Sequence, residues 1–261
     1  MYGHCEYAIR RRRYLPRARA GGVSPRLRWA ILVLLTGVAA RPGIAAERVD
    51  ASSAAEPVLE RFLASQGEAS GWPVETIEIE ASLPTLKKTG RLRAIRRLLG
   101  AGHPDYKVLE IAGDATVKNQ VIVRYISADE KANELAAPSV ALTLANYKIH
   151  YAGSAWFGNQ LTYAFRVVSR KKREGLINGV IWLDSETGSA VRETGYLAKS
   201  PSVFIKRINL TRENKFHDGA IAERITHLSV ETRLIGRARL TIVERPVTEE
   251  AAAGNVAAGG E

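Results

Sequence analysis

Alternating apolar and polar residues fill the second half of the chain and predict a ladder of β-strands. Period-two alternation is typical of a sheet with one buried and one wetter face. Residues 147–152 and 161–167 alternate in this way, whereas 177–183 is apolar at both parities, as in a strand covered on both faces. The following predicted strands are 191–197, 203–210, 221–232 and 237–242. Short connections leave no room for crossover helices, so the sheet is predicted to be antiparallel.

Two turns support this ladder. Residues 182–188 read Trp-Leu-Asp-Ser-Glu-Thr-Gly, in which Asp184 can accept hydrogen bonds from backbone amides two or three residues on. Gly188 at its end tolerates a positive φ. A second turn, His217-Asp218-Gly219, contains the Asp-Gly pair that suits a tight hairpin. Both turns therefore favour consecutive hairpins.

The preceding part of the chain combines helices with three more strands. Residues 47–66 are predicted to be helical, with a firm start near Glu56 because Pro57 follows it. A second helix is predicted over 114–134, with Asp114 as its N-cap and apolar residues at every fourth position from 117 to 125. The predicted strands here are 77–83, 91–98 and 105–111.

The charge is concentrated at the N-terminus. The chain has a formal net charge of +11. Its first 46 residues hold nine of the 38 Lys and Arg but one of the 27 acids, so the rest carries 29 bases against 26 acids, a net of +3. This small excess argues against a nucleic-acid partner, which needs a strongly basic surface.

Residues 1–46 are predicted to be a secretory signal peptide. Arg26 and Arg28 precede an apolar run over 29–40, and Ile44-Ala45-Ala46 offers a cleavage site before Glu47. A run of about a dozen residues is shorter than the roughly 20 that a membrane span needs, so an uncleaved anchor is the less favoured alternative. The predicted location is the periplasm. The domain should cover 47–245, and the Ala-, Gly- and Glu-rich residues 246–261 should be a disordered tail.

Motifs for catalysis or metal binding are absent from the sequence. It contains no Gly-x-Ser-x-Gly, no His-Glu-x-x-His and no phosphate-binding Gly-x-x-x-x-Gly-Lys. The only cysteine, Cys5, lies in the predicted leader, and the four histidines beyond it are scattered. The expectation is a protein without enzymatic activity, metal or cofactor.

Two basic clusters are candidates for contact with anionic lipid headgroups or an acidic protein surface. The alternative is a solvated rim without a partner, as for most exposed charge runs. This predicted basic rim consists of Arg91, Arg93, Arg96, Arg97, Arg170, Lys171, Lys172 and Arg173.

At this point the residues resemble a known family. The turn 182–188, the following Arg192, and Asp218-Gly219 leading to Arg224-Ile225 are similar to the LolA-like outer-membrane lipoprotein-sorting family. Its relatives include the N-terminal domain of the RseB-type envelope-stress regulator. The match covers about the last hundred residues well and the earlier half loosely. It implies an α+β fold, in which a curved antiparallel sheet, an incomplete β-barrel, covers about two helices.

The resemblance also implies an apolar concave face that accepts acyl chains. The function expected from it is a periplasmic, non-catalytic carrier or binding protein for a lipid or lipidated polypeptide. The alternative is an envelope protein-interaction or stress-sensor module on the same fold, with an envelope protein or the membrane surface as its partner. The candidate ligand-lining residues are Tyr163, Phe165, Trp182, Phe204, Leu240 and Ile242. Plain core packing is the competing interpretation of these six residues.

Overall fold

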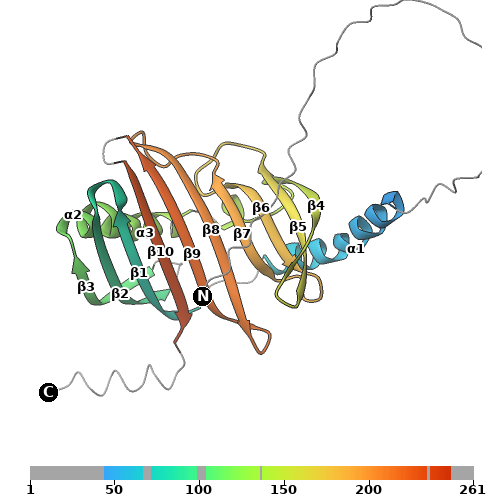
Figure 1. Ribbon diagram of the computed structural model, residues 1–261, viewed down its shortest axis with the longest axis horizontal. Helices are drawn as coiled ribbons and strands as arrows, with labels where there is room; N and C mark the ends of the chain where they lie inside the picture. The colour runs from blue at the N-terminus through green and yellow to red at the C-terminus, as the bar shows by residue number, and fades with distance from the viewer. Residues whose placement is uncertain (1–43, 67–71, 99–103, 136, 234–235, 248–261) are drawn as a thin grey trace, which may run out of the picture. The chain divides into compact units, whose positions relative to one another are not determined.

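The computed structural model describes residues 44–66, 72–98, 104–135, 137–233 and 236–247, and these form a ten-stranded antiparallel sheet that is not closed (Figure 1). The order of the strands is β3-β2-β1-β10-β9-β8-β7-β6-β5-β4. Their bounds are Val74–Leu83, Lys88–Leu98, Pro104–Gly113, Tyr147–Phe157, Gln160–Ser169, Ile177–Asp184, Ala190–Leu197, Ile205–His217, Ala220–Thr232 and Arg237–Pro246 for β1 to β10. The predicted α+β fold and all ten predicted strands are confirmed. The predicted leader and tail lie almost wholly outside the described residues.

The sheet is made by joining the first strands to the last one. β1 pairs with β10, with Ile79 opposite Ile242, so three N-terminal strands extend the seven-stranded C-terminal ladder. β3 and β4 are consequently the two edge strands. The turns predicted from Asp184 and Asp218 connect β6 to β7 and β8 to β9.

Helix α1 (Ile44–Ser65) packs against β4 and β6 through Ala55, Val58 and Phe62. The expected firm start near Glu56 is wrong, because the helix runs unbroken through Pro57. Pro57 is exposed, and buried positions lie on both sides of it. Tertiary packing therefore outweighs the local cost of the proline.

The second predicted helix is confirmed as three short consecutive segments. These are α2 (Ala115–Val117), a π-helical turn η3 (Lys118–Ile122) and α3 (Val123–Asn133). Asp114 caps them as predicted, because its Oδ1 accepts a hydrogen bond of 2.8 Å from the Thr116 amide. Val117 and Val121 are buried against the sheet. Two short elements, a 3-10 turn η1 (Pro84–Leu86) and α4 (Ala137–Val140), complete the described structure.

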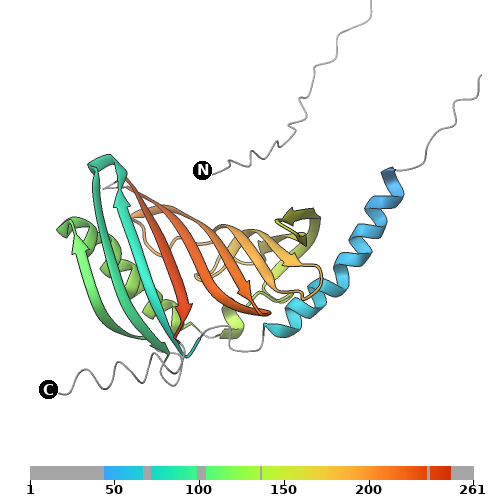
Figure 2. The ribbon, with the colours of Figure 1, turned by 60° about the horizontal axis from the view of Figure 1, so that its bottom comes forward.

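Helices α2 and α3 lie on one face of the sheet, here called the inner face (Figure 2). This face carries two apolar clusters. The first, the β1–β10 cluster, lies beneath α2, η3 and α3. It contains Ile77, Ile79, Ala81, Leu83, Leu92, Ala94, Val117, Val121, Ile122, Ala238, Leu240 and Ile242. The second, the β4–β6 cluster, is closed by α1. It contains Ala55, Val58, Phe62, Leu142, Tyr147, Phe165, Val167, Leu176, Ile181 and Leu183.

Three predicted strands differ from the sequence interpretation. β4 runs on through Gly153, beyond the predicted end at residue 152, because a bulge at this glycine (φ 133°) lets the strand continue. β8 extends to His217 instead of ending at 210. β6 was predicted to be covered on both faces, but the β4–β6 cluster covers its inner face alone. On its outer face Trp182 is only half-buried.

The β6–β7 turn has the hydrogen bonds that its sequence predicts. Asp184 Oδ1 accepts from the Thr187 amide (2.7 Å), the Thr187 hydroxyl (2.8 Å) and the Glu186 amide (3.2 Å). Gly188 has a φ of 76°. Burial raises the pKa of Asp184, but the hydrogen bonds from Thr187 and its neighbours outweigh burial, and the net shift is downward.

Replacement of this carboxylate should destabilise the turn. We expect Asp184→Ala to lower the free energy of unfolding by about 1–3 kcal/mol, because two or three donors lose their acceptor. Asp184→Asn keeps one acceptor oxygen and should cost less. Urea unfolding of both variants checks this, and equal losses would contradict it.

Candidate functional site

The inner face contains four of the six predicted lining residues, but in two separate places. Tyr163 and Phe165 belong to or pack against the β4–β6 cluster, whereas Leu240 and Ile242 belong to the β1–β10 cluster. Phe165 and Ile242 are fully enclosed, at 2% and 0% exposure. These four residues therefore contribute to core packing. Other residues form the surface between the two clusters.

Trp182 and Phe204 lie elsewhere. Trp182 pairs with Ala164 across the sheet and so faces outward, where its ring meets Phe157 edge-on at 6.1 Å. The Arg192 guanidinium lies 5.9 Å from the centres of both rings. Phe204 precedes β8 in an exposed loop. These two side chains therefore do not lie with the other four on the inner face.

The centre of the inner face, over β8 and β9, carries four apolar side chains that sequence analysis did not select. Ile208 pairs with Val230 and Leu210 with Leu228. All four are half-buried, in contrast to the enclosed clusters on either side. Beside Leu210 the inner face carries no side chain at Gly195 or at its cross-strand partner Gly179. We call Ile208, Leu210, Leu228 and Val230 the central apolar surface.

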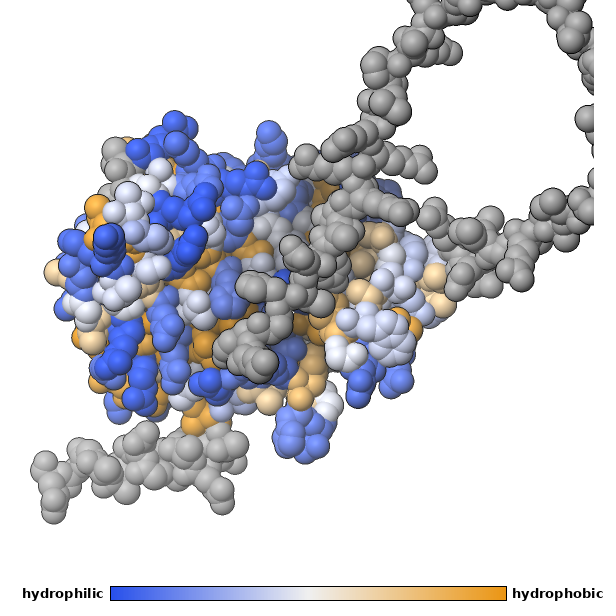
Figure 3. Space-filling view, in the orientation of Figure 1, coloured by the Kyte–Doolittle hydropathy of each residue, from blue (hydrophilic) through white to orange (hydrophobic). Residues whose placement is uncertain are grey.

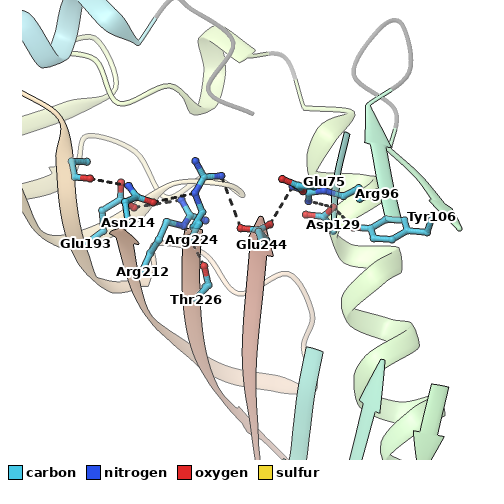
Figure 4. Close-up of polar contacts among 11 residues, drawn as sticks. Glu75, Arg96, Tyr106, Asp129, Glu193, Arg212, Asn214, Arg224, Thr226 and Glu244 are labelled. Carbon is cyan, nitrogen blue, oxygen red and sulfur yellow. Dashed lines mark hydrogen bonds and ion pairs between the residues drawn. The ribbon is translucent and has the colours of Figure 1, made fainter. Parts of the chain in front are cut away.

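A row of charged and polar side chains crosses the same face, nearer the β8–β9 turn (Figure 4). It runs from β7 across β8, β9, β10, β1 and β2 to β3 and meets α3. We call this row the charged strip. Its members are Glu193, Arg212, Asn214, Arg224, Thr226, Glu244, Glu75, Arg96, Asp129 and Tyr106.

Arg96 is the centre of one half of the strip. Its guanidinium forms ion pairs with Glu75, with Asp129 at 3.0 Å and with Glu244 at 3.1 Å. The Tyr106 hydroxyl donates a 2.6 Å hydrogen bond to Asp129. Arg96 and Glu75 are 8% and 1% exposed. Three carboxylates thus share one largely buried arginine.

This crowding moves the pKa values of several groups. Burial raises the pKa of Glu75 to about 7, with Arg96 opposing the shift and Glu244 adding to it. Burial lowers the pKa of Arg96, but Asp129, Glu75 and Glu244 outweigh it and the net shift is upward. Burial, together with the neighbouring Asp129, raises the pKa of the Tyr106 hydroxyl.

The other half of the strip borders the central apolar surface. Arg212 approaches Glu193 at 3.5 Å, and Arg224 approaches Glu244 at 3.9 Å and donates to Asn214 at 3.2 Å. Both ion pairs are long. Burial lowers the pKa of Arg224, and the like charge of Arg212 lowers it further. The centre of the inner face therefore combines an apolar floor with two adjacent guanidinium groups.

The predicted basic rim is divided among three places. Arg96 is buried in the charged strip and is not part of a rim. Arg91 and Arg93 are exposed on β2 and pair with Glu110 at 2.6 and 4.0 Å. Arg97 is exposed on the same strand. The remaining four residues, 170–173, lie together in the β5–β6 loop.

Within that loop the four side chains differ in their contacts. Arg170 donates to the Leu144 and Tyr147 carbonyls at 2.9 and 3.1 Å. Arg173 donates to the Ser139 carbonyl and to Asn146 Oδ1 at 3.1 and 2.7 Å. The side chains of Lys171 and Lys172 are exposed and show no hydrogen bond or ion pair with the described residues.

The surface also has hollows. One of about 550 Å³ lies at the β1–β2 hairpin and has Glu80, Arg91, Arg239 and Thr241 among its lining residues. In the part of the chain described here, no three His, Cys, Asp or Glu side chains are grouped as metal ligands. None of its helices has the length and apolarity for crossing a membrane.

No family model and no curated protein matches this chain. Among solved structures it is similar to an outer membrane lipoprotein-sorting protein domain from Vibrio parahaemolyticus, with 12% identity and a TM-score of 0.35 over 77% of this chain and 98% of that one. It is also similar to the LolA superfamily protein NE2245 from Nitrosomonas europaea, with 9% identity and a TM-score of 0.35 over 75% and 96%.

A third similar structure is MucB of Pseudomonas aeruginosa in its complex with MucA, at 9% identity and a TM-score of 0.25, covering 77% of this chain and 96% of that one. At such identities the likeness concerns the fold alone. The fold of the described residues is an open antiparallel sheet of ten strands with few helices.

Proposed function

We propose that this protein is a non-catalytic binding protein of the bacterial envelope that holds the acyl chain of a lipid or lipidated polypeptide on its inner face. The observation that supports this proposal is the central apolar surface. Its four side chains are half-buried between two enclosed clusters, and it is the part of the inner face where added apolar area can still be covered.

Burial of acyl groups there supplies the binding energy, at about 0.8 kcal/mol for each CH₂ group. Arg212 lies beside this surface with its side chain 42% exposed, so it can contact a polar headgroup or a peptide carbonyl. The ligand is then an amphiphile whose apolar part covers Leu210 and Leu228. Four of the six residues chosen from the sequence pack in or against the two clusters beside this surface. Trp182 and Phe204 lie outside it.

Binding of an apolar fluorescent dye tests the proposal. The delipidated protein should enhance dye fluorescence, a long-chain lipid should displace the dye, and the lipid should raise the melting temperature because it binds the folded state. Leu210→Glu should weaken dye and lipid binding on the order of tenfold or more, since it places a charge on the apolar floor.

Thr211→Glu is the matched control, because this neighbouring residue faces outward on the same strand and is also half-buried. It should leave binding unchanged. The melting temperatures of both variants without ligand separate loss of binding from loss of folding. If lipids of several chain lengths neither displace the dye nor stabilise the protein, the carrier proposal is wrong.

The second candidate is a protein-interaction module, and the exposed edge strand β3 favours it. Val108, Leu109 and Ile111 are 40–50% exposed on this strand, which has a neighbour on one side alone. Such an edge can pair with an extended segment of another protein. This interpretation takes the place of the carrier if the lipid experiment fails.

A further inference from the structure

One end of the sheet gathers basic loops. Five short segments lie there: 84–88, 170–176, 198–207, 231–233 and 236–239. They contain twelve Lys and Arg against two acids, Glu174 and Glu231, and Lys88 also pairs with Asp114 at 3.2 Å, which leaves an excess of nine positive charges. The turns at the opposite end of the strands, 157–160, 184–190 and 217–220, contain three acids and no Lys or Arg. We call the first end the basic loop surface.

Contacts between the loops make this surface continuous. The Arg233 amide and its Nε donate to the carbonyls of Phe204 and Val203, each at 2.9 Å. The Ala198 amide donates to the Leu176 carbonyl at 2.8 Å, and Lys199 pairs with Glu174 at 3.1 Å. Loops far apart in the sequence are therefore held side by side. In Figure 3 hydrophilic residues gather along the upper edge, where these loops lie.

Apolar side chains project from the same end. Val203 is 78% exposed and Phe204 56%, and Val203 is the most exposed large apolar side chain of the described structure. Leu86 on η1 is 46% exposed, and Leu144 beside Arg170 is 56% exposed. Val203 and Phe204 are adjacent in one loop, so together they form an apolar tip within the basic loop surface.

We infer that the basic loop surface docks on an anionic lipid bilayer, with Val203 and Phe204 entering the interface and the surrounding lysines and arginines contacting phosphate groups. Charge complementarity carries this choice, because each Lys or Arg near an anionic leaflet contributes favourably and nine are in excess. The charges and apolar tips are spread over several loops around an open hollow of about 400 Å³, which has Thr85, Lys206 and Arg237 among its lining residues. That arrangement suits a fluid surface of headgroups better than one shaped protein partner.

This docking surface goes beyond the proposed acyl-chain site and does not depend on it. The two lie on different parts of the sheet, because the central apolar surface is on the inner face of β8 and β9. A protein that fails to bind dye on its inner face can still dock on a bilayer. A protein that fails to dock on a bilayer can still bind dye. The two inferences therefore fail or succeed in separate experiments.

An environment-sensitive fluorophore on the loop tests the docking. The chain's one cysteine is Cys5, so Cys5→Ser with Val203→Cys gives a single labelling site. Cys5→Ser with Ala220→Cys is the matched control, exposed at the opposite end of the strands. All forms share residues 1–46, so differences between them do not arise from that basic segment.

The expected result is a blue-shifted, brighter emission from the label at 203, but not at 220, on adding vesicles with 30% phosphatidylglycerol in phosphatidylcholine. Vesicles of phosphatidylcholine alone should give little response, and 0.5 M salt should reduce the anionic response by screening. Lys171→Glu with Lys172→Glu should weaken vesicle binding on the order of tenfold or more. Lys107→Glu with Lys131→Glu, an equal charge change on exposed residues outside these loops, should have a smaller effect.

Three outcomes would overturn the inference. The labels at 203 and 220 could respond alike, neutral and anionic vesicles could act equally, or the two charge-reversal variants could bind equally well. Binding to soluble polyglutamate at 150 mM salt without any response to vesicles would assign the surface to an acidic protein instead.

Discussion

Arg96→Met is expected to lower the free energy of unfolding by about 3–5 kcal/mol, because it leaves charged partners buried without compensation. Glu75, Asp129 and Glu244 would then face one another with Arg96 removed. The nearest remaining cation for Glu244 is Arg224, at 3.9 Å. Urea unfolding at neutral pH measures the loss.

Arg91→Met is the matched control on the same strand. The Arg91 side chain is 64% exposed and pairs with Glu110 at 2.6 Å on the outer face. Exposed pairs contribute little, so this variant should lose less than about 1 kcal/mol. The cost of Arg96→Met should also shrink in acid, where the orphaned carboxylates become protonated. Equal losses from the two variants would show that burial does not set the strength of these pairs.

Arg96 also shows where sequence analysis stopped short. Alternation within 91–98 separates Arg96, which has the parity of Leu92 and Ala94, from Arg91, Arg93 and Arg97. That parity was a usable signal that Arg96 faces the core. Its partners could not be found in the same way, because Glu75, Asp129 and Glu244 come from β1, α3 and β10 and meet only through tertiary pairing.

The ladder itself was predictable because its signals are local. Alternation marks each strand, and the turns at Asp184 and Asp218 carry their own side-chain chemistry. The pairing of β1 with β10 joins residues about 160 positions apart, and no local pattern encodes it. Side-chain direction was likewise undetermined for Trp182, because its strand is apolar at both parities.

The central apolar surface was missed for a related reason. Leu210 and Leu228 have the same local pattern as fully buried strand residues, but among the described residues they are only half-buried, with Leu228 at the margin of the β1–β10 cluster. That property depends on where α1 and α3 pack. Sequence therefore indicates the inner face well, but the accessible part of it follows from the tertiary arrangement of the helices.

The stability of the protein should also depend on the protonation of Glu75. Its pKa in the folded protein is raised to about 7 from 4.5, first by burial and then by Glu244. The folded state therefore holds this proton more tightly than the unfolded state. The stabilisation is fully present below about pH 4.5 and is lost as the pH rises through 7, amounting to roughly 3 kcal/mol.

Glu75→Gln removes this titration while keeping the size of the side chain. At pH 4.5 the variant should be no more stable than the wild type. Between pH 4.5 and pH 8 its free energy of unfolding should rise relative to that of the wild type by up to roughly 3 kcal/mol. Free energies of unfolding in urea at half-unit steps of pH measure the difference. Glu244→Gln is a second check. Removing this neighbouring charge should lower the pKa of Glu75 in the folded protein, so the loss of stability should begin at a lower pH than in the wild type. Parallel profiles for the wild type and Glu75→Gln would show that Glu75 does not titrate differently in the folded and unfolded states.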